Sequence, residues 1–242
     1  MENNNPDYVY NNIVQLGDAD ASRKFLANVF MWMFVALGIS ALCAYVFANS
    51  SLIYTLVDQN THQFTGLAYI VMFAPLAFVL IMRFGLNKIS YPVLSLLFIA
   101  YSAVTGISLS FILLAFTASS VIGVFITSSV VFGVMAIAGY TTKQDLTKFG
   151  SILIMFLIGI VVASVVNMFL HSSGLDMIIS YIGVAVFVGL TAYDVQKLKN
   201  IGAGLVYGDA KASKMALMGG LTLYLDFINL FIMLLRVFGR RR

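Results

Sequence analysis

The sequence has little charge, little histidine and almost no cysteine, and each shortage excludes something. Only 10% of its 242 residues are charged, whereas a soluble domain carries roughly 25% to cover its surface. The single cysteine, Cys43, excludes a disulfide within the chain and lies in an apolar run, where a buried thiol is expected. The two histidines, His62 and His171, fall between apolar runs and are expected to be solvated.

Most of the sequence consists of long apolar runs. Hydrophobic residues make up 61% of the chain, and the mean hydropathy is +0.97. The runs are long enough to cross a hydrocarbon core about 30 Å thick, and they are continuous rather than alternating, which favours helices over a β-barrel. We therefore predict an all-α membrane protein, a bundle of seven transmembrane helices with spans at 25–47, 66–82, 89–114, 119–140, 149–170, 178–198 and 216–238.

The connections between the spans are short, so the sequence predicts one membrane domain over residues 23–242. Residues 1–22 form a polar, Asn-rich stretch without the basic-then-apolar pattern of a cleaved signal peptide. We expect this stretch to be a cytoplasmic tail, disordered or interfacial, and the first span to act as the insertion signal.

Basic residues occur in every second connection and are absent from the alternate ones. This pattern places the N-terminus in the cytoplasm of a multi-pass protein of the plasma (inner) membrane. It also argues against a nucleic-acid partner, because no basic face or patch is formed. The residues concerned are Arg23, Lys24, Arg83, Lys88, Lys143, Lys148, Lys197, Lys199, Lys211 and Lys214.

The arginines at the C-terminal end conflict with this orientation. Seven crossings would leave Arg236, Arg240, Arg241 and Arg242 on the outer side. Either the other connections dominate, or the last segment re-enters and returns to the cytoplasm. We favour a full span.

Two aspartates, Asp194 and Asp226, lie within apolar spans. An aspartate near the centre of a membrane helix costs roughly 2.5 to 3.5 kcal/mol on the insertion scale. The seventh span is apolar enough to insert despite that cost. An ionisable residue in such a position is a functional hypothesis by default.

Helical spacing gives these aspartates polar neighbours. Thr222 and Asn229 share a helix face with Asp226, and Thr191 shares one with Asp194, so both stripes should face the bundle interior. Polar positions on other spans are candidates to line the same interior, and Arg83 is a natural counter-ion near the cytoplasmic face. The further lining candidates are Ser102, Thr105 and Asn167.

Structural interpretations of the same residues stay open. Asp194 could be an interfacial residue paired with Lys197, and Asp226 could make a purely structural hydrogen bond. Arg83 could be a helix-end anchor that snorkels to the interface. The two aspartates also lie at different depths, and a break at Gly219-Gly220 would bring them level.

The two aspartate motifs resemble those of a known family. The segment 221–239, LTLYLDFINLFIMLLRVFG, resembles the C-terminal signature of the Bax inhibitor-1 family, the transmembrane Bax inhibitor motif proteins. Tyr193-Asp194-Val-Gln196 resembles the family's sixth-helix motif, and the segment 105–109 and Asn167 also fit. The resemblance covers nearly the whole chain, and its compact form is similar to bacterial members.

The resemblance implies a fold and an activity. Family members wrap six helices around a central seventh and pass calcium as a pH-sensitive leak. Their paired aspartates match Asp194 and Asp226, and their arginine partner matches Arg83, although Phe84 and Gly85 follow here where members often have more basic residues. The implied partners are the bilayer, calcium and protons; no cofactor is expected, and protein partners are not identified.

These residues suggest a switch. Two carboxylates in one desolvated site cannot both ionise cheaply, so they hold a proton between them. We expect an ionised Asp194 to latch onto Arg83, and protonation of the pair to weaken that latch. When ionised, Asp194 and Asp226 would form a hard oxygen site for transient calcium, with too few ligands for tight binding.

Two rival functions remain. Paired aspartates on the last two spans also resemble intramembrane aspartyl proteases, but Asp226 follows Leu-Tyr-Leu rather than Gly-x-Gly, and the Pro-Ala-Leu motif of those proteases is absent. Zinc-protease and nucleophile-elbow motifs are absent too, so no enzyme is expected. The other rival is a non-transporting protein that regulates other membrane proteins in stress or quality control.

Overall fold

Seven long helices make up most of the computed structural model, which describes the backbone of residues 6–59, 63–205 and 210–242. Side chains are described from residue 20 onward in these ranges. Each helix is long and apolar enough to cross a membrane. They are α1 (Pro6–Ala48), α2 (Gly66–Gly85), α3 (Tyr91–Ala115), α4 (Ala118–Thr141), α5 (Thr147–Leu170), α6 (Ser173–Ala203) and α7 (Ala210–Phe238), with a short 3-10 helix, η1 (Ser51–Thr55), after α1.

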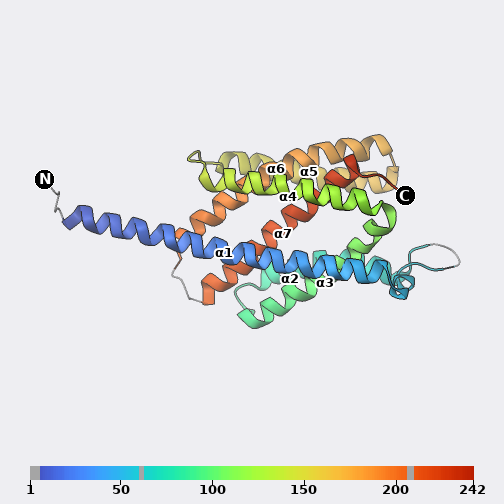
Figure 1. The fold of residues 1–242 in the computed structure, drawn as a ribbon, viewed down its shortest axis with the longest axis horizontal. Helices are drawn as coiled ribbons and strands as arrows, with labels where there is room; N and C mark the ends of the chain where they lie inside the picture. Colours follow the sequence, from blue (N-terminus) through green and yellow to red (C-terminus); the bar gives the residue numbers. More distant parts are fainter. Residues whose placement is uncertain (1–5, 60–62, 206–209) are drawn as a thin grey trace.

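Two three-helix layers enclose α7. Helices α1, α2 and α3 lie on one side and α4, α5 and α6 on the other, and α7 runs obliquely between them (Figure 1). Helix α7 packs against α1, α3, α4 and α6, and it is the most buried of the seven. The prediction of an all-α bundle with a central seventh helix is confirmed.

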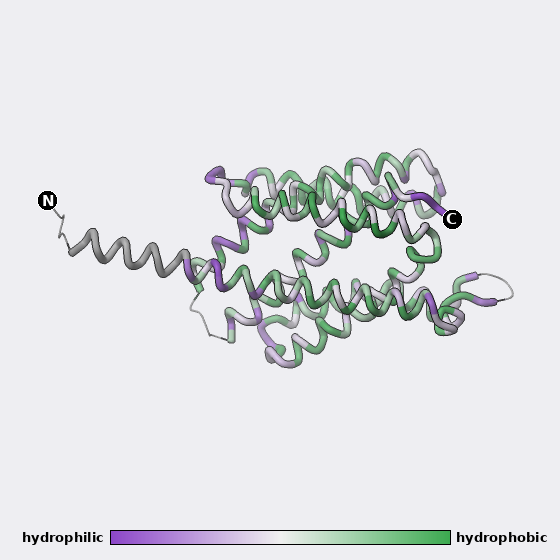
Figure 2. Tube along the Cα trace, in the orientation of Figure 1, coloured by the Kyte–Doolittle hydropathy of each residue, from purple (hydrophilic) through white to green (hydrophobic). Residues whose placement is uncertain are grey.

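Hydropathy explains where the helices begin and end. The helices are hydrophobic along most of their length and more hydrophilic towards the ends of the bundle (Figure 2). The predicted spans agree with the observed helices to within a few residues, except at the start of α1, at both ends of α6 and at the start of α7. Helix α6 is longer at both ends because polar residues continue it, with Ser172 accepting a hydrogen bond from the backbone of Leu175 at its start.

Part of the N-terminal stretch is helical, which was not predicted from the sequence. Helix α1 begins at Pro6, so the described part of the expected tail is helical and continuous with the first span. Proline is well tolerated in the first turn of a helix, and no later proline interrupts α1. A transmembrane span therefore extends as a helix beyond its apolar part. Residues 1–5 lie outside the described residues.

Helix α7 is continuous through Gly219 and Gly220, so the break that could have brought the two aspartates level is absent. The glycines serve close packing instead. A Cβ atom added to Gly220 would lie 2.6 Å from Cβ of Trp32 and 3.0 Å from the carbonyl oxygen of Val29, both on α1. The absence of a side chain therefore lets α7 approach the α1 backbone closely.

The last helix makes a full crossing. Its C-terminal residues lie beside the α3–α4 turn, where the backbone of Thr117 donates to Arg240 and that of Arg242 donates to Ala115, both at 3.0 Å. This turn lies at the opposite end of the bundle from the start of α7 (Figure 1). The alternative of a re-entrant last segment is excluded.

Candidate functional site

Asp226 is the most deeply placed acid in the described part of the chain. It projects from the middle of α7 and is only 5% exposed. Its Oδ2 atom is buried and has no hydrogen-bond partner among the described residues. An unpaired buried polar atom costs about 1 to 3 kcal/mol of folding stability. Asp226 is therefore a candidate for a functional role that explains this loss of stability.

Asp194 of α6 is the acid that faces Asp226. It is half-buried, and the two carboxyl groups lie within hydrogen-bonding reach of each other. Because α7 runs obliquely, Asp226 lies beside Asp194 although α7 has no break. Carboxylates are acceptors only, so a hydrogen bond between them requires that one carries a proton.

Two cations act on Asp194 from a distance. Arg83, near the end of α2, and Lys197, one turn further along α6, both interact electrostatically with it. Both side chains are exposed, and neither forms a salt bridge with a described residue. In this conformation the expected pairing of Arg83 with Asp194 is therefore a long-range attraction and not a bonded contact.

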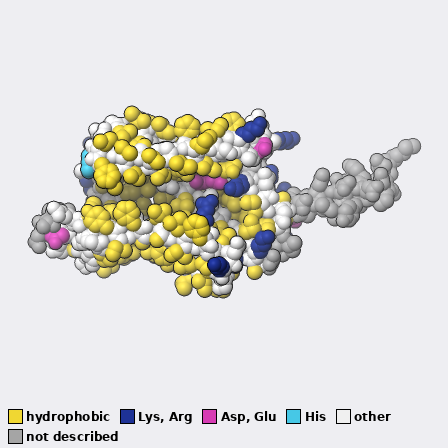
Figure 3. Space-filling view, turned by 180° about the vertical axis from the view of Figure 1, so that it is seen from behind, with side chains coloured by type: hydrophobic (Ala, Val, Ile, Leu, Met, Phe, Trp, Pro, Cys, Tyr) yellow, Lys and Arg dark blue, Asp and Glu magenta, His cyan; other side chains and the backbone are white. Residues whose placement is uncertain are grey.

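The face between α2–α3 and α5–α6 is hollowed. Figure 3 shows this hollow, with apolar side chains along both walls and acidic side chains beside lysine or arginine in its depth. Helix α2 packs mainly on α3, so the protein leaves the gap towards α6 uncovered. The aspartate pair is consequently reached from the side of the bundle.

The polar neighbours expected on α6 and α7 bond to their own helices. Thr191 is fully buried and donates to the carbonyl of Phe187. Thr222 and Asn229 are half-buried and donate to carbonyls four residues earlier, at 3.1 and 2.8 Å. Each donates one hydrogen bond within α7, and their side-chain oxygens stay available as acceptors.

Ser102 and Thr105 of α3 belong to a second polar cluster. Ser40 of α1 donates to the carbonyl of Ser102 at 2.7 Å and pairs with the hydroxyl of Tyr224 at 2.7 Å. Tyr224 is fully buried against Tyr101. Sequence reasoning missed this cluster, although a lone serine within a long apolar run is the signal that marks it.

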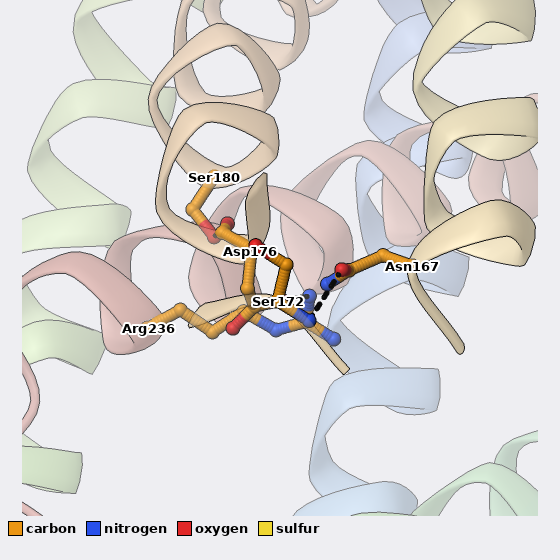
Figure 4. Close-up of polar contacts among 5 residues, drawn as sticks. All are labelled: Asn167, Ser172, Asp176, Ser180 and Arg236. Atoms are coloured by element: carbon orange, nitrogen blue, oxygen red, sulfur yellow. Dashed lines mark hydrogen bonds and ion pairs between the residues drawn. The ribbon is translucent and has the colours of Figure 1, made fainter. Parts of the chain in front are cut away.

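Asn167 lies in the last turn of α5 and not around the aspartate pair. Its side-chain oxygen accepts a hydrogen bond from the backbone of Ser172 at 3.0 Å (Figure 4). It lines a cleft of about 610 Å³ with Asp176 and Arg236, which form a salt bridge of 3.0 Å between α6 and α7. Sequence reasoning gave Arg236 no partner.

Gln196 anchors the segment that carries Asp194. Its side chain accepts from the backbone of Leu146 at 2.9 Å and donates to the carbonyl of Gln144 at 2.7 Å. It thereby fastens α6 to the α4–α5 connection. In that connection, hydrogen bonds from the hydroxyl and the backbone N–H of Thr147 lower the pKa of Asp145.

Comparison with known proteins identifies the family of this chain. The family model described as inhibitor of apoptosis-promoting Bax1 matches residues 22–242. The chain belongs to the Bax inhibitor-1 family. Among relatives, Inner membrane protein YbhL of Escherichia coli K12 is 47% identical over 221 residues, which cover 91% of this chain and 93% of YbhL.

Other relatives in the Bax inhibitor-1 family are also bacterial. An uncharacterized protein of Borreliella burgdorferi is 44% identical over 91% of this chain and 93% of its own length. An uncharacterized membrane protein of Streptococcus pyogenes serotype M6 is 37% identical over 90% and 93%. Together with the seven apolar helices, these matches show an integral multi-pass membrane protein.

Proposed function

We propose that this protein is a pH-sensitive, calcium-permeable leak of the plasma (inner) membrane, controlled by Asp194 and Asp226. The observation that carries the proposal is the burial of two interacting carboxyls, one with an unpaired oxygen, in the wall of a hollow. Most buried side-chain oxygens in folded proteins are hydrogen-bonded, so an unpaired one supports a role beyond packing. No catalytic step is part of the proposal.

Protonation provides the control. While the two carboxyls share a proton, the site carries one negative charge beside Arg83 and Lys197. Loss of that proton adds a second negative charge, which favours a hard divalent cation such as calcium. No third acid, histidine or cysteine joins the pair among the described residues, so water and backbone would supply most ligands and the ion would leave readily.

Arg83 biases this equilibrium. Its positive charge near Asp194 favours the ionised carboxylate. We expect a contraction of the gap between α2 and α6 to bring the two into a bonded pair, which would close the side of the hollow. Protonation would weaken that attraction and favour the open form.

Calcium flux into dye-loaded proteoliposomes tests the proposal. Wild type and Asp226→Asn are compared between about pH 6 and pH 8. We expect flux that depends on protein and on pH, with the pH response lost in the variant. Asp145→Asn is the matched control because its carboxylate is exposed, and it should behave as wild type.

Absence of flux at every pH would favour the alternative, a non-transporting regulatory protein. The description of the matched family as an inhibitor of apoptosis-promoting Bax1 names that kind of effect. The carboxyls would then serve packing or partner recognition.

Orientation is tested separately. The proposal places the N-terminus in the cytoplasm, with the α4–α5 connection inside and the α1–α2 connection outside. In a Cys43→Ala background, a membrane-impermeant thiol reagent added to intact cells should label Gln63→Cys and spare Asp145→Cys. The reverse pattern would overturn the assignment.

A further inference from the structure

The mouth of the hollow between α2 and α6 carries positive charge without a bonded anion. Arg83 and Lys197 are exposed, and each lies close enough to Asp194 to act on it. Neither forms a hydrogen bond or a salt bridge with a described residue; Lys197 contacts only the ring of Tyr193, at 5.7 Å from its centre. Arg83 lies in the last turn of α2, at the end of an apolar span, where long basic side chains reach towards the lipid headgroups.

The walls of the hollow are apolar and open to the bilayer. Figure 3 shows hydrophobic side chains on both sides of it. Helix α2 packs mainly on α3, so no helix covers the gap towards α6. The space thus combines an apolar groove with a basic mouth, and the molecule that matches both is an amphiphile with an anionic head.

We propose that this hollow binds an anionic phospholipid, with its phosphate between Arg83 and Lys197 and its acyl chains along the apolar walls. Guanidinium groups bind phosphate oxygens in a bidentate manner, and the lysine adds a point charge. A phosphate held there competes with Asp194 for Arg83. The binding itself does not depend on whether the protein conducts calcium.

Native mass spectrometry of the purified protein tests the binding. Phosphatidylglycerol and phosphatidylcholine are titrated separately, and wild type should retain phosphatidylglycerol preferentially. The double variant Arg83→Gln with Lys197→Gln should weaken phosphatidylglycerol binding about 30-fold, from the loss of two cations near the headgroup. Arg83→Lys keeps the charge but loses the bidentate geometry, so its affinity should lie between those of wild type and the double variant.

Lys143→Gln with Lys148→Gln is the matched control. These two lysines are also exposed at the same end of the bundle, beside the α4–α5 connection, and their loss should change the affinity less than about threefold. An equal loss in the control, or equal affinity of wild type for the two lipids, would overturn the proposal. Displacement of the lipid by excess inorganic phosphate would assign the site to a free anion instead.

Arg83 makes no bond to a described residue, so its loss should leave the fold intact; elution profile and thermal midpoint check this. If the double variant cannot be purified, Lys197→Gln alone carries the test with an expected loss of about fivefold. An unchanged affinity in that variant counts against the site. None of these measurements uses calcium, so they stand whatever the flux experiment gives.

Discussion

Helices α6 and α7 meet at two acidic positions, and the two are built differently. The more exposed one, the outer contact, is the 3.0 Å salt bridge between Asp176 and Arg236, whose side chains are about one third exposed. The more buried one, the inner contact, joins Asp194 to Asp226, which is only 5% exposed and has an oxygen with no hydrogen-bond partner among the described residues. The same helix pair thus matches acid with base where water has access, and acid with acid where it does not.

This contrast indicates what each position does. A solvated ion pair adds little free energy and tolerates change. A buried acid pair is costly, and its charge depends on a proton that must enter or leave. The outer contact is therefore expected to hold two helices together, and the inner one to respond to pH.

Asp226→Leu should have the largest effect, because it removes the acid pair of the inner contact. It removes an unsatisfied buried carboxyl, so the free energy of unfolding should rise by about 1 to 3 kcal/mol, while pH-dependent calcium flux disappears. Denaturant titration in detergent and the proteoliposome assay measure the two effects, with Asp226→Asn as the polar control. A loss of stability of similar size would show that Asp226 is a structural hydrogen-bond partner.

Gln196→Ala tests whether Gln196 anchors the segment of α6 that carries Asp194. It removes two hydrogen bonds, at 2.9 and 2.7 Å, that fasten α6 to the α4–α5 connection next to Asp194. We expect a loss of about 1 to 3 kcal/mol in the free energy of unfolding. Gln144→Ala, in the same connection, removes an exposed side chain and should change stability by less than about 0.5 kcal/mol. Equal effects of the two variants would contradict the anchoring role.

The outer ion pair should show a smaller coupling. A double-mutant cycle with Asp176→Asn and Arg236→Gln is expected to give about 0.2 to 1 kcal/mol. The pH response of flux should be unchanged in all three variants. A coupling well above that range would mean that the outer contact is as desolvated as the inner one.

Asp145 gives the smallest expected effect. It titrates at a much lower pH than a sensor that works near neutrality. Hydrogen bonds from Thr147 hold the pKa of Asp145 below its usual value of 3.8 in the folded protein. Its stabilising contribution is therefore complete above about pH 5 and is lost as pH falls through the lowered pKa. The difference in thermal midpoint between wild type and Asp145→Asn should stay constant from about pH 7 to pH 5 and shrink below pH 4. A difference that grows on acidification would contradict this.

The sequence was sufficient for the fold because each span is an uninterrupted apolar run. It also placed Asp194 and Asp226 in the membrane, since an acid in such a run is costly to insert and marks a site in the bundle interior. The family resemblance implied that the two aspartates form a pair, but the residue pattern alone did not show that they meet, because their meeting depends on the oblique course of α7. The break considered at Gly219-Gly220 does not occur, because these glycines allow α1 and α7 to pack closely while the helix continues.

Contacts between residues far apart in the sequence could not be predicted, because they also depend on how the helices pack. Asp176 and Arg236 are 60 residues apart, and no local pattern links them. Asn167 was expected in the interior because it is polar and lies in an apolar run, but its position at the C-terminal end of α5 lets it bond to the next connection. Ser40 gave a usable signal and was overlooked, while the helical continuation of α1 back to Pro6 has no hydrophobic signature.

The central position of α7 has a consequence for assembly in the cell. Helix α7 is translated after the six helices that surround it, so these enter the membrane before the element against which four of them pack has been made. Until then, the faces of α1, α3, α4 and α6 that pack against α7 lack that partner. An insertion chaperone or a quality-control protease would therefore meet this chain at its most vulnerable stage, in the interval between insertion of the sixth span and arrival of the seventh.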